Sequence, residues 1–245
     1  ISESPLLDGD RLIVTPGGPG ASIVALNKKN GTLIWKSQSD KAGYSSAIVF
    51  DFGGIRQIVT LTGQGAVGLA AKNGELLWRY DKISNRTANI ATPIYRDGHI
   101  FVSTDYGTGC ALLKLTVSGG GVKADEVYFN KDMRNHYSSS VLVGNHLYGF
   151  SSQILTAMKF DTGEVAWKDR SVGKGSVAYV EGLLYCLGEN GTMGLVEAMP
   201  ESYKEISRFE IQKGEYPMWT PPVIANGRMY LRDQDNLYSY GIKAK

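Results

Sequence analysis

The side chains best suited to chemistry in this sequence are few and far apart. Its three histidines are His99, His136 and His146, and its two cysteines are Cys110 and Cys186. The spacings that bring zinc ligands or a redox pair together, His-Glu-x-x-His and Cys-x-x-Cys, do not occur. We interpret His99 and His146 as turn residues. We interpret the cysteines as buried small hydrophobes rather than a disulfide, which leaves the redox compartment open. We therefore predict no catalytic group and no metal site.

Three further stretches have compositions that are found in binding sites. RDQD (232–235) carries two carboxylates two positions apart, but Ca²⁺ takes six or more oxygen ligands. TPGGPG (15–20) and SGGG (118–121) are rich in glycine, but neither leads from a strand into a helix, as a phosphate-binding loop does. We therefore interpret all three stretches as turns or loops between strands.

The composition argues against nucleic-acid binding and against a membrane-spanning helix. The chain has 245 residues, with 26 basic and 24 acidic side chains and a net charge of +2. No long basic run is present, so we expect no nucleic-acid partner. No apolar run reaches the roughly 20 residues of a membrane-spanning helix, so membrane association would come only through a partner or an anchor missing from this sequence. The sequence starts at Ile1 and shows no signal peptide.

A hairpin phrase recurs along the chain. It consists of a short apolar run, a turn that contains glycine and a second apolar run, as in SPLLDGDRLIV and TPIYRDGHIFV. The pairs Asp-Gly, Gly-Gly, Gly-Asn and Asn-Gly tolerate the positive φ of tight hairpin turns. We therefore predict six β-hairpins, 38 to 46 residues apart, whose turn glycines are Gly9, Gly54, Gly98, Gly144, Gly182 and Gly227.

A second phrase keeps the same period. KKNGTLIWK, AKNGELLWR and FDTGEVAWK each place a glycine four residues before a tryptophan: Gly31 and Trp35, Gly74 and Trp78, Gly163 and Trp167. We predict that each glycine turns the chain between a third and a fourth strand, and that each tryptophan docks against the neighbouring unit. Four strands in every 40–50 residues or so are the pattern of a β-propeller blade.

The two phrases divide the chain into about six blade units within one domain, 1–245. The last unit ends without a fourth strand, and no spare strand precedes Ser4. Because an unpaired strand edge is a liability, we predict that the chain is part of a larger ring. The predicted fold class is all-β, with units that span 4–44, 45–88, 89–136, 137–174, 175–218 and 219–245.

The tryptophan phrase resembles the tryptophan-docking motif of the quinoprotein, or PQQ-like, β-propellers, which is roughly Ala-x-Asp-x-x-Thr-Gly-x-x-x-Trp. The chain also resembles uncharacterised bacterial, planctomycete-type proteins of this kind. The resemblance implies a ring of seven or eight blades and an extracytoplasmic, periplasmic location. The matching residues are Ala25, Asn27, Gly31 and Trp35, then Gly74 and Trp78, then Ala157, Thr162, Gly163 and Trp167.

The resemblance raises the question of catalysis. PQQ-dependent dehydrogenases of this superfamily use Ca²⁺ held by oxygen ligands, a carboxylate base and commonly a disulfide between adjacent cysteines. Here Cys110 and Cys186 lie far apart, and no residue matches the calcium ligands. We therefore expect a non-catalytic scaffold or binding module for a protein partner or small ligand, without a cofactor. The alternatives are a PQQ-dependent oxidoreductase with Ca²⁺ and a structural subunit of a larger assembly.

Binding on a propeller is expected in the loops, because the blades hold the loops rigid. Loops before the innermost strands and loops between the second and third strands open on the same face. Their aromatic and charged side chains offer contact area and charge to a ligand or partner. Alternatively, the same side chains pack the mouth of the central channel. The candidate residues are Tyr44, Asn89, Tyr106, His136, Tyr137, Lys174, Trp219, Arg232 and Asp233.

Overall fold

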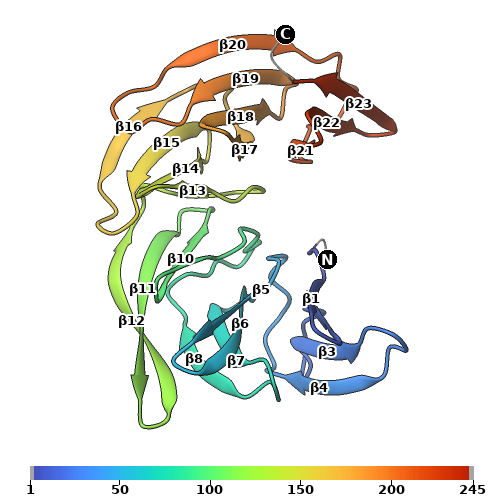
Figure 1. The fold of residues 1–245 in the computed structure, drawn as a ribbon, viewed down its shortest axis with the longest axis vertical. Helices are drawn as coiled ribbons and strands as arrows, with labels where there is room; N and C mark the ends of the chain where they lie inside the picture. The colour runs from blue at the N-terminus through green and yellow to red at the C-terminus, as the bar shows by residue number, and fades with distance from the viewer. Residues whose placement is uncertain (1–2, 243–245) are drawn as a thin grey trace. The chain divides into compact units, whose positions relative to one another are not determined.

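The computed structural model describes residues 3–242, and all regular secondary structure in that range is β-strand. Figure 1 shows these strands as successive sheets along the chain. Contacts divide the chain into two compact units, Ile1–His136 and Tyr137–Lys245, which we call unit 1 and unit 2. The predicted all-β fold of repeated four-stranded sheets is confirmed. No helix within residues 3–242 could span a membrane.

Unit 1 contains three antiparallel sheets of four strands, and each strand pairs with the next one in the sequence. The first sheet consists of β1 (Leu6–Asp8), β2 (Arg11–Val14), β3 (Ile23–Asn27) and β4 (Leu33–Ser37). The second consists of β5 (Ile48–Phe52), β6 (Ile55–Leu61), β7 (Ala66–Ala70) and β8 (Leu76–Tyr80). The third consists of β9 (Ile94–Arg96), β10 (His99–Thr104), β11 (Gly109–Ser118) and β12 (Gly121–Asn130).

Unit 2 continues the same topology. The fourth sheet consists of β13 (Val141–Val143), β14 (His146–Ser151), β15 (Ile154–Lys159) and β16 (Val165–Asp169). The fifth consists of β17 (Gly175–Val180), β18 (Leu183–Gly188), β19 (Thr192–Glu197) and β20 (Glu205–Glu210). Within the described residues the sixth sheet has three strands, β21 (Val223–Ala225), β22 (Arg228–Asp233) and β23 (Asn236–Gly241).

The hairpin turns form where the glycines predict them. All six turn glycines have positive φ, between 55° and 84°. Asp97 and Asn226, each directly before a turn glycine, also have positive φ, of 48° and 53°. Two consecutive residues with positive φ match the right-handed twist of the flanking strands, which is why Asp-Gly and Asn-Gly pairs are favoured there.

The apolar core lies between successive sheets of a unit. In unit 1 one cluster of buried side chains joins the first and second sheets, and another joins the second and third. In unit 2 two further clusters join the fourth sheet to the fifth and the fifth to the sixth. The central strand β6 has five consecutive buried residues, as expected for a strand covered on both faces. The second sheet of unit 1 and the fifth sheet, in unit 2, therefore each pack against a neighbour on both sides.

Trp35 connects the first sheet to the second. Its indole Nε1 donates a hydrogen bond of 3.1 Å to the carbonyl oxygen of Ala71, and the side chain is buried. A Cβ atom on Gly74 would come within 2.5 Å of the Trp35 ring. Gly74 also has a φ of 74°, a conformation that favours glycine. The turn glycine of one sheet therefore makes room for the tryptophan of the sheet before it.

The other two tryptophans of the motif differ from each other. Trp167 donates from Nε1 to the carbonyl oxygen of Met199 in the fifth sheet, at 2.8 Å. Trp78 packs in the cluster shared with the third sheet, but its Nε1 donates to Oε1 of Gln57 within its own sheet, at 3.0 Å. Trp35 and Trp167 therefore donate their indole N–H to a backbone carbonyl of the next sheet, whereas Trp78 does not.

Between the second and third sheets, polar contacts to Glu126 accompany the apolar packing of Trp78. Its outer hairpin β11–β12 is ten residues long on each side, and SGGG forms the tip, where Gly119 and Gly120 have φ of 58° and 81°. Glu126 on β12 accepts hydrogen bonds from the Tyr80 hydroxyl and from Nζ of Lys82, the latter at 2.8 Å. The Lys82 contact, followed by the Tyr80 contact, holds the pKa of Glu126 below its usual value.

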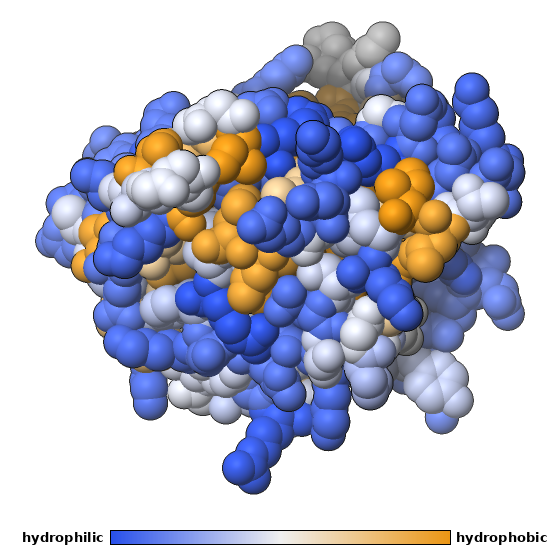
Figure 2. All heavy atoms as spheres, turned by 90° about the horizontal axis from the view of Figure 1, so that it is seen from below, coloured by the Kyte–Doolittle hydropathy of each residue, from blue (hydrophilic) through white to orange (hydrophobic). Residues whose placement is uncertain are grey.

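Large exposed apolar side chains are scattered. On the face seen in Figure 2 they form small patches separated by hydrophilic atoms. Several lie on outer strands, such as Leu33 on β4 and Leu76 on β8, whereas Tyr106, Tyr216 and Trp219 lie in loops. Single exposed apolar residues are ordinary on a protein surface, so only the loop aromatics call for an explanation.

Replacing Trp35 with alanine should lower the free energy of unfolding by about 3–5 kcal/mol, because it removes a buried ring and leaves a cavity between two sheets. Leu33→Ala is the control, since Leu33 lies on the same strand and is 57% exposed. The control should cost less than about 0.5 kcal/mol. Urea denaturation measures both changes. A loss below about 1 kcal/mol for Trp35→Ala would show that the ring does not join the sheets.

Both cysteines should be protected from alkylation in the folded protein. Cys110 and Cys186 are buried and free, and burial raises the pKa of each thiol to about 12. Because only the thiolate reacts, iodoacetamide at mildly alkaline pH should label neither residue in the native protein and both in urea. Mass spectrometry locates the label. Rapid labelling of either cysteine in the native protein would contradict this placement.

Candidate functional site

The nine candidate binding residues lie in both units, in or beside the loops at the ends of inner strands. Unit 1 contains Tyr44, Asn89, Tyr106 and His136. Unit 2 contains the other five: Tyr137, Lys174, Trp219, Arg232 and Asp233. The two groups have different surroundings.

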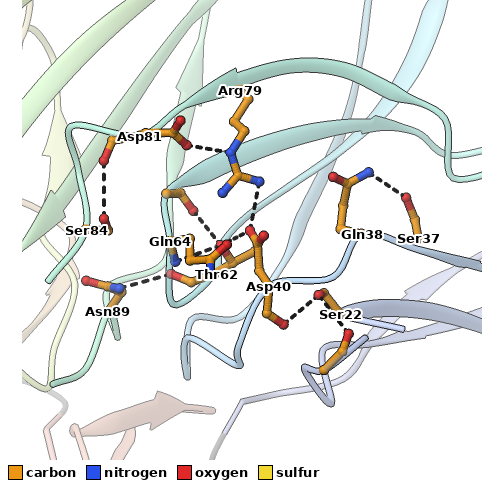
Figure 3. A network of polar contacts seen from close by, with 12 residues as sticks. Ser22, Ser37, Gln38, Asp40, Thr62, Gln64, Arg79, Asp81, Ser84 and Asn89 are labelled. Atoms are coloured by element: carbon orange, nitrogen blue, oxygen red, sulfur yellow. Dashed lines mark hydrogen bonds and ion pairs between the residues drawn. The ribbon is translucent and has the colours of Figure 1, made fainter. Parts of the chain in front are cut away.

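A buried ion pair anchors the loops of unit 1. Nη1 of Arg79 lies 2.8 Å from Oδ2 of Asp40, and the Thr62 hydroxyl donates to the same oxygen at 2.6 Å. The Ser22 hydroxyl donates to the carbonyl oxygen of Asp40, also at 2.6 Å. Figure 3 shows these side chains converging on Asp40. The network fixes the loop that precedes β5, because both the carboxylate and the backbone of Asp40 are engaged.

Asn89 is a second polar anchor of the same loops. Its Nδ2 donates to the carbonyl oxygen of Thr62 at 3.0 Å, and its Oδ1 accepts from the Thr104 hydroxyl at 3.0 Å (Figure 3 shows the first bond). Oδ1 also accepts from the backbone N–H of Asn85 at 3.0 Å. Asn89 is only 1% exposed. Asn89 therefore holds these loops together from a buried position, and it also contributes to the lining of a pocket.

An open pocket of about 580 Å³ lies among these loops. Two candidate residues line it, the partly buried Tyr44 and the buried Asn89. The φ of Tyr44, 122°, is sparsely populated outside glycine. The backbone of Tyr44 forms an isolated parallel bridge with that of Asn89. The other polar side chains of the pocket were not predicted from the sequence, although Lys41 and Arg86 each lie three residues before a candidate residue. These side chains are Lys41, Gln64, Asn85, Arg86 and Thr87.

Tyr106 and His136 come together in the third sheet of unit 1. The Tyr106 hydroxyl lies 2.8 Å from Nε2 of His136, and the ring centroids are 5.1 Å apart. Tyr106 is 48% exposed. The pair links the loop between β10 and β11 to the end of the unit and leaves the Tyr106 side chain half-exposed.

Unit 2 gathers three predicted residues around Glu189; we call Tyr137, Lys174, Glu189 and Trp219 the Trp219 cluster. The rings of Tyr137 and Trp219 stack with centroids 5.6 Å apart. Nζ of Lys174 lies 5.7 Å from the Tyr137 centroid, 6.0 Å from the Trp219 centroid and 3.5 Å from Oε2 of Glu189. Nε1 of Trp219 donates to the same carboxylate oxygen at 3.1 Å. Glu189 was not among the residues predicted from the sequence.

These contacts fix Trp219 while leaving it accessible. The side chain remains 53% exposed although it takes part in a hydrogen bond, a ring stack and a cation–π contact. Burial raises the pKa of the Tyr137 hydroxyl, so that group stays neutral. A rigid, half-exposed indole beside a compensated charge pair is typical of protein-binding surfaces.

The loop between β22 and β23 contains the last two candidates. Arg232 is exposed, and its Nε donates to the carbonyl oxygen of Gln234 at 3.1 Å. Asp233 is 1% exposed, and its Oδ2 accepts from the backbone N–H of Gly214 at 2.5 Å. Asp233 is therefore buried, whereas Arg232 reaches the surface. The turn predicted for RDQD is confirmed.

No group of three or more His, Cys, Asp or Glu side chains within residues 3–242 could hold a metal ion. A Ca²⁺ ion bound beside PQQ would require several oxygen ligands. The buried carboxylates of Asp40 and Asp233 are engaged separately, one by Arg79 and one by a backbone N–H group. The described residues therefore do not fit the calcium site that the quinoprotein resemblance implies.

Comparison with known proteins supports the fold. A family model described as "Outer membrane protein assembly factor BamB" matches residues 1–169. No curated protein sequence matches the chain.

Three solved structures share the architecture. BamB from Moraxella catarrhalis has a TM-score of 0.72 and 14% identity over 96% of this chain and 70% of that chain. The computationally designed Ika8 protein has a TM-score of 0.66 and 9% identity over 98% of this chain and 70% of that one. Quinohemoprotein alcohol dehydrogenase from Comamonas testosteroni has a TM-score of 0.62 and 11% identity over 94% of this chain and 51% of that one.

These low identities show the fold alone, whereas the family match rests on sequence. That match extends from the N-terminal end of the chain to the end of β16, so it includes the first four sheets. The chain is a PQQ-like β-propeller protein, and it belongs to the family described as outer membrane protein assembly factor BamB.

Proposed function

We propose that this protein is a non-catalytic scaffold outside the cytoplasm that binds a protein partner through its loops. The family description, an outer membrane protein assembly factor, supports a location in the cell envelope and a role in an assembly. The observation that carries the binding role is the Trp219 cluster, in which a 53% exposed indole is held in one orientation.

The rigidity of Trp219 lowers the cost of binding a partner. A partner that covers an already ordered side chain loses little conformational entropy at the interface. Trp219 meets this condition because Glu189 accepts its N–H and Tyr137 supports its ring. Lys174 and Glu189 compensate each other's charge, so covering the indole does not isolate either charge. The cluster therefore suits a partner with an apolar or aromatic anchor and a polar surround.

Two alternatives have less support. A PQQ-dependent oxidoreductase would have the fold of the quinohemoprotein alcohol dehydrogenase, but within residues 3–242 no three His, Cys, Asp or Glu side chains gather where they could hold a metal ion. A structural subunit of a larger assembly would contact its neighbours through outer strands such as β20, where Ile206 is 49% exposed. Trp219 and Ile206 therefore separate loop binding from outer-strand packing.

Photo-crosslinking in the source cells tests the proposal. A photoreactive phenylalanine placed at position 219 should give a discrete adduct with one protein, whereas the same residue placed at position 206 should not. Adducts from position 206 alone would favour the structural subunit. Identical adducts from both positions, or none from either, would contradict binding through the loops.

Trp219→Ala should reduce recovery of the crosslinked partner by at least about tenfold, as expected for a hot-spot aromatic residue. The melting temperature should stay close to that of the unmodified protein, because Trp219 is largely exposed. Ile206→Ala is the matched control and should leave recovery unchanged. If the melting temperature falls and recovery does not, Trp219 serves packing rather than binding.

A further inference from the structure

The pocket of unit 1 carries two positive charges that the fold does not use. Lys41 and Arg86 line it, and within residues 3–242 neither side chain has a carboxylate within ion-pair distance. The acid next to Lys41 in sequence is Asp40, which is already engaged by Arg79 and Thr62. The pocket therefore has a net positive lining that fold stability does not explain.

The loops that carry these cations are fixed in advance. The backbone N–H of Gly63 donates to the carbonyl oxygen of Lys41 at 2.8 Å. Oδ1 of Asn85 accepts from the backbone N–H groups of Thr87 and Ala88, both at 2.8 Å, and so closes the loop around Arg86. A charged ligand would meet a backbone that needs little reorganisation, which lowers the cost of binding.

The size and chemistry of the pocket indicate the class of ligand. A volume of about 580 Å³ falls in the range of pockets that hold many-atom ligands, so a single small ion would leave it largely empty. Gln64 and Thr87 add amide and hydroxyl groups to the lining, and Tyr44 adds an aromatic ring. Such a lining matches an extended segment that combines backbone amides with acidic side chains.

We propose that this pocket binds an acidic peptide segment, whose carboxylates are held by Lys41 and Arg86. The inference rests on the proposed function only in taking the ligand to be a polypeptide. The site itself lies in unit 1 and shares no residue with the Trp219 cluster. If the pocket binds no acidic peptide, binding through Trp219 can still occur. If Trp219 binds no partner, the pocket can still bind an acidic peptide.

Fluorescence anisotropy with the purified protein tests the proposal. The probe is a labelled peptide of alternating Asp and Gly residues, and the reference peptide has Asn in place of Asp. The Asp peptide should bind, and the Asn peptide should bind at least about tenfold more weakly. The double variant Lys41→Gln/Arg86→Gln should weaken binding of the Asp peptide by about tenfold or more, whereas Lys41→Arg/Arg86→Lys should restore most of the affinity.

The matched control is Lys29→Gln/Lys72→Gln, which removes the same charge from exposed turns between third and fourth strands. It should change the affinity by less than about twofold. Equal losses in both double variants would show non-specific attraction and overturn the proposal. Displacement by inorganic phosphate, beyond that caused by chloride at equal ionic strength, would also overturn it in favour of a phosphate site. Equal binding of the two peptides would show that carboxylates are not recognised.

Discussion

A four-stranded sheet with two apolar faces cannot remain alone in water, and this constraint organises the whole protein. Among the described residues, four core clusters each join side chains of two successive sheets of one unit. The contact between Trp35 and the turn of the next sheet shows how the constraint is met. The indole covers apolar surface, its N–H satisfies the carbonyl of Ala71, and Gly74 leaves the necessary space. The stacked sheets in turn hold the ends of the loops in place, so the loop sequences can differ without changing the fold.

The two units use this freedom in different ways. In unit 1 the loop side chains Asp40 and Asn89 turn inward and form buried polar networks, and the outward cations Lys41 and Arg86 remain without ion-pair partners among the described residues. In unit 2 an ion pair and a stacked ring hold Trp219 at the surface. Matching positions of the repeat therefore perform unlike tasks, which is consistent with scaffold proteins that bind by their loops.

The fold could be predicted from the sequence because its signals are local. A turn glycine such as Gly98 and the apolar runs beside it determine a hairpin without reference to distant residues. The hydrogen-bond acceptor of each indole N–H could not be predicted from such local signals. Trp78 carries the same phrase as Trp35, yet its N–H goes to Gln57. The apolar join to the third sheet gains a polar contact from Glu126 on the outer hairpin.

The candidate sites were harder to predict than the fold, for a physical reason. A polar loop residue either faces solvent or satisfies buried backbone groups, and its type does not distinguish these cases. Asn89 and Asp233 are buried, whereas Trp219 and Arg232 are exposed. The roles of Glu189 and Arg86 depend on loops that meet only in the folded chain, so the sequence pattern alone did not reveal them.

The central claim is that this propeller serves as a scaffold and not as a quinoprotein enzyme. The most direct measurement is equilibrium dialysis of the purified protein with PQQ and Ca²⁺, followed by the absorbance of retained quinone and by reduction of an electron-accepting dye with alcohols. A scaffold should retain no stoichiometric quinone and reduce no dye. Retention of one quinone per chain together with dye reduction would contradict the account.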